Sequence, residues 1–150
     1  MNLTVKIEQT GAELSSIVSK ASGREFVWNA DPSVWGSSAP VLFPIVGGLK
    51  NGQSSHNGVT FSMPRHGIVR HNTNIHVIEQ EHDRITFRLT ADERTLEHYP
   101  FRFTFDINFR VKDNSVIITH IVKNTDNQDM YFSVGAHPAF NCPINAGESY

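Results

Sequence analysis

Residues Phe101 to Val111 alternate apolar and polar side chains without interruption over eleven positions. Phenylalanine, isoleucine and valine occupy one face of this segment, and polar residues occupy the other. Successive side chains of a strand point to opposite faces, so the pattern predicts a β-strand with one buried face. Such a strand must pack its apolar face against a second layer, which limits the chain to a sheet-based fold.

Similar patterns surround this segment. Ile85, Phe87 and Leu89 form another apolar face, whereas residues 116–122 are apolar on both faces, which indicates a central strand. Turns are expected at residues 112–115 and 124–129, where Asp and Asn gather. The further strands that we predict span residues 3–8, 13–19, 25–28, 60–63, 75–80 and 130–134.

Helix signals are scarce. The one helix-like piece runs from Asp92 to Glu97 and is ended by Tyr99-Pro100. Residues 31–58 are rich in Gly, Pro and Ser but include an apolar cluster, and we predict a long functional loop there. We therefore expect an all-β, antiparallel sandwich, with residues 1–150 forming a single domain.

Composition excludes several classes of function. The formal charge is −2 and no basic run occurs, which argues against a nucleic-acid partner. No apolar stretch approaches the ~20 residues that span a bilayer, so no membrane partner is expected. The N-terminus lacks a signal-peptide pattern, and the single cysteine, Cys142, fits a reducing compartment. We expect a cytoplasmic protein.

Two histidines lie in segments that Gly and Pro keep out of regular pairing. His137 lies in Gly135-Ala-His-Pro-Ala-Phe-Asn141, and His66 lies in Met63-Pro-Arg-His-Gly-Ile-Val-Arg70. Gly and Pro restrict how a chain pairs, and loops carried by rigid strands commonly hold catalytic groups. Histidine titrates near neutral pH, so acid–base chemistry is indicated. Taken alone, each histidine would more often be a structural residue that closes a turn.

Four motifs occur together in a distinctive order: Trp35 followed by residues 40–44, then 64–67, 99–101 and 135–141. In this order the chain resembles the aldose 1-epimerases, and most of all the LacX-like branch of galactose mutarotase-related proteins. The resemblance covers nearly the whole chain. It implies a galactose mutarotase-like β-supersandwich and an isomerase that interconverts anomers of free or phosphorylated aldoses. It also implies a small-molecule sugar substrate and no metal or organic cofactor.

The resemblance also implies roles for three residues. His137 matches the histidine that protonates the sugar ring oxygen, and His66 matches a histidine that hydrogen-bonds a sugar oxygen. Arg70 matches an arginine suited to a hydroxyl or a phosphate. The family's general base is a glutamate far downstream of the histidine motif, and no residue here is assigned that role. Residues 142–150 resemble a loop that leads into a further strand, so we expect an N-terminal half that is incomplete at its C-terminus.

Other functions remain open at this point. The missing base favours a non-catalytic sugar-binding module or pseudoenzyme, and a metal-dependent cupin-like sandwich is a further alternative. The cupin alternative requires clustered ligands such as His-x-His, and the sequence has none. No metal site is expected, because the remaining histidines lack ligand spacing. Trp35 is interpreted as a packing residue rather than a sugar platform. Residues 1–150 expressed alone are expected to be poorly soluble or oligomeric.

Overall fold

The structure is a computed structural model that describes residues 2–142. All ladders between its strands are antiparallel, which confirms the predicted all-β antiparallel class. The predicted loop over residues 142–150 lies outside the described residues, apart from Cys142. The strands are β1 (Leu3–Glu8), β2 (Glu13–Ser19), β3 (Val41–Leu42), β4 (Gln53–His56), β5 (Val59–Ser62), β6 (His76–Gln80), β7 (Arg84–Thr90), β8 (Phe103–Lys112), β9 (Ser115–Asn124) and β10 (Gly135–Ala136). The helical pieces are η1 (Thr10–Ala12), η2 (Lys50–Gly52) and α1 (Glu93–His98).

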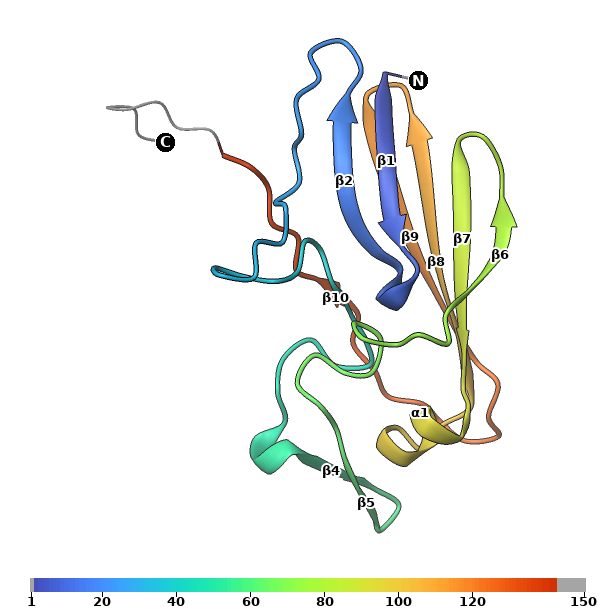
Figure 1. Cartoon of the computed structure of the whole chain (residues 1–150). Coiled ribbons are helices and arrows are strands. Elements are labelled where there is room, and N and C mark those ends of the chain that lie inside the picture. The colour runs from blue at the N-terminus through green and yellow to red at the C-terminus, as the bar shows by residue number, and fades with distance from the viewer. Residues whose placement is uncertain (1, 143–150) are drawn as a thin grey trace.

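The largest sheet has four strands in the order β6-β7-β8-β9, and the β1–β2 hairpin packs across one face of it (Figure 1). The buried apolar side chains of β8 are those of its predicted apolar face, Phe103 to Phe109 in steps of two, while Asp106 on the other face is buried in its pairing with Arg88. Phe105 pairs with Leu89 of β7 and stacks on Phe43, with 4.5 Å between ring centroids. This aromatic layer forms the core and anchors the segment around Phe43, which holds the candidate site.

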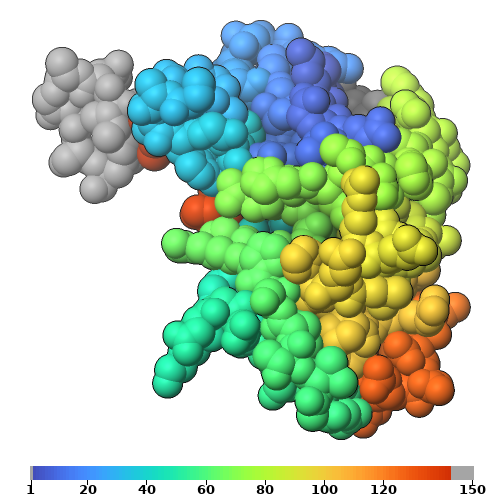
Figure 2. Space-filling view, turned by 60° about the horizontal axis from the view of Figure 1, so that its bottom comes forward, coloured from blue at the N-terminus to red at the C-terminus, as the bar shows by residue number. Residues whose placement is uncertain are grey.

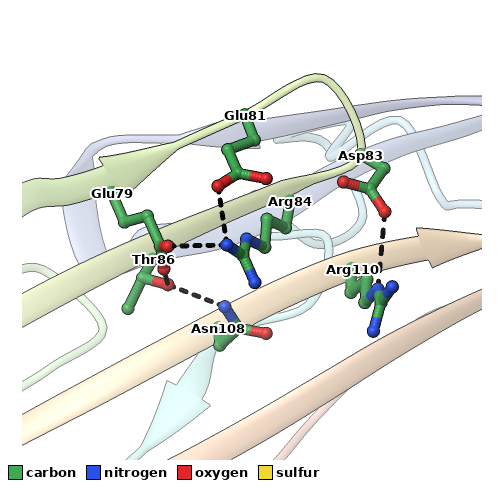
Figure 3. Close-up of polar contacts among 7 residues, drawn as sticks. All are labelled: Glu79, Glu81, Asp83, Arg84, Thr86, Asn108 and Arg110. Atoms are coloured by element: carbon green, nitrogen blue, oxygen red, sulfur yellow. Dashed lines mark hydrogen bonds and ion pairs between the residues drawn. The ribbon is translucent and has the colours of Figure 1, made fainter.

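The opposite face of the sheet is polar (Figure 3). Arg84 bridges Glu79 at 3.0 Å and Glu81 at 2.6 Å, and Asn108 donates to the hydroxyl of Thr86 at 2.7 Å. Exposed ion pairs of this kind contribute little to stability, because solvent screens them. Burial of the apolar face therefore supplies most of the stability and leaves this polar face toward solvent.

Two of the predicted strands are wrong. Residues 25–28 make only isolated bridges, because the Glu25 carboxylate accepts the backbone N–H groups of Ile17 and Val27, a role that a neighbouring strand would otherwise fill. Residues 130–134 are extended but form no ladder, and their backbone is instead fastened at single points, such as Ser133 N–H to the Pro44 carbonyl. The regular pairing begins only at β10.

Three further expectations need correction. The predicted long loop over residues 31–58 contains β3, η2 and β4, and β4 forms a hairpin with β5 through Asn57 and Gly58. β9 was predicted to be central, but it ends the strand order of its sheet and several of its isoleucines are exposed. The helix is confirmed, with Asp92 as its N-cap rather than its first residue.

Candidate functional site

His137 follows directly on a short strand pairing. Gly135 and Ala136 of β10 pair with Leu42 and Val41 of β3, and the His137 N–H donates to the Pro40 carbonyl at 3.1 Å. The whole β3 segment is buried. The backbone of His137 is therefore fixed by the core through β10, which lies at Gly135–Ala136 rather than in the predicted strand over residues 130–134.

His66 is brought to the same place through Phe43. Phe43 follows β3 directly and forms a bridge with Gly67, and the Ile68 N–H donates to the Phe43 carbonyl at 2.8 Å. Gly67 has a φ of +81°, and a Cβ at this position would lie 2.0 Å from the Phe43 carbonyl oxygen. Only glycine allows this close approach. The buried segment 41–43 thus contacts both histidine-bearing segments.

The two histidines lie near each other at the surface. Their ring centroids are 6.2 Å apart, and the Trp35 ring lies 5.0 Å from that of His137. His137 is exposed and His66 is partly buried, so neither ring is sealed in the apolar interior. The structure therefore brings together His66 and His137, and both can be reached by a ligand.

The ring orientation of His66 is set by the backbone. Its Nδ1 lies 2.6 Å from the Val46 carbonyl oxygen, and the backbone N–H of His66 donates to the Gly47 carbonyl at 2.8 Å. A carbonyl oxygen can only accept, so Nδ1 carries a proton and Nε2 of the neutral ring is a free acceptor. These two contacts also support a φ of +71°, which is uncommon for residues other than glycine.

Trp35, interpreted from the sequence as a packing residue, lies beside His137. Its backbone N–H donates to the Asp31 carbonyl at 2.8 Å, and its carbonyl accepts from the Trp28 indole at 2.9 Å. The indole is partly exposed, and the His137 imidazole lies next to it. The sequence feature that could have indicated this position is a tryptophan in a Gly- and Ser-rich loop, where a large aromatic ring offers a stacking surface for a ligand.

Arg70 is held beside the same segment as Trp35. Its guanidinium donates to the Ser37 hydroxyl at 3.2 Å, and its Nε is buried with no hydrogen-bond partner within residues 2–142. Gly11, with a φ of +67°, leaves room for the Arg70 backbone, whose carbonyl oxygen would lie 2.6 Å from a Cβ there. Arg70 is thereby fixed in position, with donor capacity left for a ligand.

Within the described residues, neither His66 nor His137 has a carboxylate partner. No Asp or Glu in residues 2–142 makes a hydrogen bond or ion pair with the imidazole of His66 or His137. In the same residues, no group of three or more His, Cys, Asp or Glu is placed to hold a metal ion. No helix in this part of the chain is long and apolar enough to cross a membrane. Two imidazoles beside an indole can move protons to and from a polyhydroxy ligand.

The comparisons with known proteins agree with one another. The aldose 1-epimerase family model matches residues 1–149. The plasmid-encoded and chromosomal LacX proteins of Lactococcus lactis are each 34% identical to this chain, over 99% of it and 51% of the relative. The chain therefore spans about half the length of the curated relatives it matches.

Solved structures give the same result. A galactose mutarotase related enzyme from Lactobacillus acidophilus superposes with a TM-score of 0.95 at 39% identity, over 99% of this chain and 50% of that one. A galactose mutarotase-like protein from Lactobacillus casei gives 0.92 at 32% identity, over 97% and 49%. With a family model that matches almost every residue, the chain belongs to the aldose 1-epimerase family.

Proposed function

We propose that this protein is a carbohydrate epimerase that interconverts the α and β anomers of an aldose or a hexose phosphate. The observation that supports this most is the pair of accessible imidazoles, 6.2 Å apart, beside the Trp35 indole. Membership of the aldose 1-epimerase family and the similarity to galactose mutarotase-related structures support the same class of substrate.

The chemistry requires one acid and one base. A base removes the proton of the C1 hydroxyl while His137 donates a proton to the ring oxygen, so the bond between C1 and the ring oxygen breaks and an aldehyde forms. Rotation about C1–C2 then exposes the other carbonyl face. Reclosure by the reverse proton transfers gives the opposite anomer, and each group contributes about 10²–10⁴-fold in rate.

The geometry supports three further proposed roles. Nε2 of neutral His66 accepts a hydrogen bond from a sugar hydroxyl, because Nδ1 is committed to the Val46 carbonyl. Arg70 binds a hydroxyl or a phosphate oxygen, and Trp35 stacks on the sugar ring. We assign the base to a carboxylate outside residues 2–142.

A second candidate is a sugar-binding module without catalysis. It is favoured by the lack, in residues 2–142, of any Asp or Glu hydrogen-bonded or ion-paired to either imidazole. Such a module would bind sugars through the same residues but would leave the anomer exchange rate at that of the buffer.

Polarimetry on fresh α-glucose and α-galactose tests the proposal, using the complete gene product. We expect a faster approach to the equilibrium rotation than in buffer, in proportion to protein concentration. Exchange spectroscopy by NMR extends the assay to hexose phosphates and detects binding in the same sample. Sugar binding with no acceleration of exchange would establish the module instead, and neither binding nor acceleration would contradict both functions.

A further inference from the structure

A cleft of about 290 Å³ lies between residues 64–74 and the helix α1. Figure 2 shows the face of the molecule on which these two segments, green and yellow, lie side by side. The volume is near the lower end of the roughly 300–1,000 Å³ usual for small-molecule sites. The cleft is therefore sized for a small polar group or for one end of a larger ligand.

The side chains that line this cleft are strongly basic. Three arginines contribute, Arg65, Arg70 and Arg94, together with His71 and His98, and no Asp or Glu is among the lining residues. The chain as a whole has a formal charge of −2, so this concentration of cations is local. A cleft lined by one sign of charge attracts ligands of the opposite sign.

Two of these guanidinium groups are free to bind. Arg65 and Arg94 are exposed, and neither side chain has a hydrogen bond or an ion pair within the described part of the chain. Three arginines elsewhere are paired, Arg84 with Glu79 and Glu81, Arg88 with Asp106 and Arg110 with Asp83, whereas Arg24 and Arg102 make no ion pair within the described residues. The cleft thus contains cations that the fold itself does not neutralise.

One carboxylate, Asp92, borders the cleft, and its oxygens are already engaged. One oxygen accepts from the Asn74 amide at 2.9 Å, and the other accepts from the Thr95 N–H at 2.8 Å. Asn74 and Thr95 themselves line the cleft. Asp92 therefore acts as a helix cap that orders the wall. It lies near enough to Arg94 for an electrostatic interaction, but within the described residues it forms no ion pair with either exposed arginine.

We propose that this cleft binds a phosphate dianion, either as inorganic phosphate or as the phosphate of a phosphorylated ligand. A phosphate monoester carries between −1.5 and −2 charges near pH 7 and offers three strong acceptor oxygens. Arginine matches these oxygens through two parallel N–H donors, which gives short charge-assisted hydrogen bonds. Arg65 lines one wall of the cleft and Arg94, on α1, lines the other, so both walls carry a guanidinium of this kind.

The cleft and the histidine pair share one loop. Arg65 and Gly67 line the cleft, whereas the intervening His66 directs its ring to the Val46 carbonyl and lies near His137. Arg70, assigned above to substrate, is also part of the cleft wall. If the phosphate is borne by the sugar, the inference rests on the proposed function; if it is free phosphate, it does not.

Calorimetric titration of the complete gene product with inorganic phosphate tests the site directly. We expect saturable binding, weakened about tenfold or more in both Arg65→Gln and Arg94→Gln, since each loses charge-assisted hydrogen bonds. Arg24→Gln removes the same charge from an exposed arginine that lies over the Phe26 ring, and it should bind phosphate within twofold of the unaltered protein. Arg94→Lys keeps the charge, and its affinity for phosphate should lie between those of Arg94→Gln and the unaltered protein.

A second set of titrations distinguishes free phosphate from the phosphate of a sugar. Glucose 6-phosphate that binds more tightly than both glucose and inorganic phosphate indicates a substrate-borne group, and equal binding of the two phosphates indicates a free anion. Because binding is measured without turnover, a failed mutarotation assay leaves these results intact. No saturable phosphate binding, or equal weakening by Arg24→Gln, would overturn the proposal.

Discussion

Nδ1 of His66 lies 2.6 Å from the carbonyl oxygen of Val46, which fixes the role of each ring nitrogen. The neutral ring is expected to carry its proton on Nδ1, because a carbonyl cannot donate. Nitrogen-15 NMR of labelled histidine distinguishes the two tautomers at a pH where the ring is neutral. Protonation on Nε2 instead would contradict the role of that nitrogen as an acceptor for a sugar hydroxyl.

Gly67→Ala should strongly destabilise the protein. The new Cβ would meet the Phe43 carbonyl oxygen at 2.0 Å, in addition to the strain of a φ of +81°. We expect a loss of roughly 3 kcal/mol or more in the free energy of unfolding, measured by urea denaturation. Gly58→Ala is the matched control, because its φ is +79° with nothing within 4 Å of the Cβ, and strain alone costs about 1–2 kcal/mol. Equal losses would show that the contact with Phe43 is not tight.

The regular part of the fold could be predicted because its signal is local. The alternation in residues 101–111 depends on which face of a strand is buried, and β8 buries that face. β4 was missed because Gln53-Ser54-Ser55-His56 has no apolar alternation, and its pairing with β5 depends on the Asn57-Gly58 turn. The edge position of β9 depends on the order of strands, which side-chain pattern alone does not contain.

The candidate site could be predicted only in part. Gly and Pro around His66 and His137 marked both as loop histidines held by strands, and the structure places their rings near each other. The neighbouring Trp35 is separated from both in sequence, and its contact with His137 arises from the folding of the 31–40 loop. The basic cleft was missed for the same reason, since Arg65 and Arg94 lie on different elements.

Asp92→Ala should lower stability at neutral pH but not at low pH. The hydrogen bond from Asn74, followed by those from the backbone and side chain of Thr95, lowers the pKa of the Asp92 carboxyl. A carboxyl with a lowered folded-state pKa stabilises the fold above its unfolded pKa, and this stability is lost as pH falls through the folded value. We expect a cost of about 1 kcal/mol at pH 7 from the lost cap. Urea unfolding at several pH values checks this, and a difference that does not change with pH would contradict it.

Residues 1–150 expressed alone should self-associate. The strand β9 pairs only with β8 in the described residues, and Ile117 and Ile121 on its outer face are 44% and 52% exposed. An exposed apolar edge strand promotes association with other chains. Sedimentation velocity should show oligomers, and the double variant Ile117→Lys, Ile121→Lys should shift them toward monomer. A monodisperse monomer of the unaltered chain would count against this expectation.

The most direct test of the account is the mutarotation rate of His137→Ala, measured by polarimetry on the complete gene product with fresh α-galactose. His82→Ala is the control, since His82 lies in the exposed turn between β6 and β7. We predict that His137→Ala lowers the catalysed rate about 10²–10⁴-fold, whereas His82→Ala leaves it unchanged. A His137→Ala protein that remains folded and equilibrates the sugar as fast as the unaltered protein would contradict the assignment of His137 as the acid.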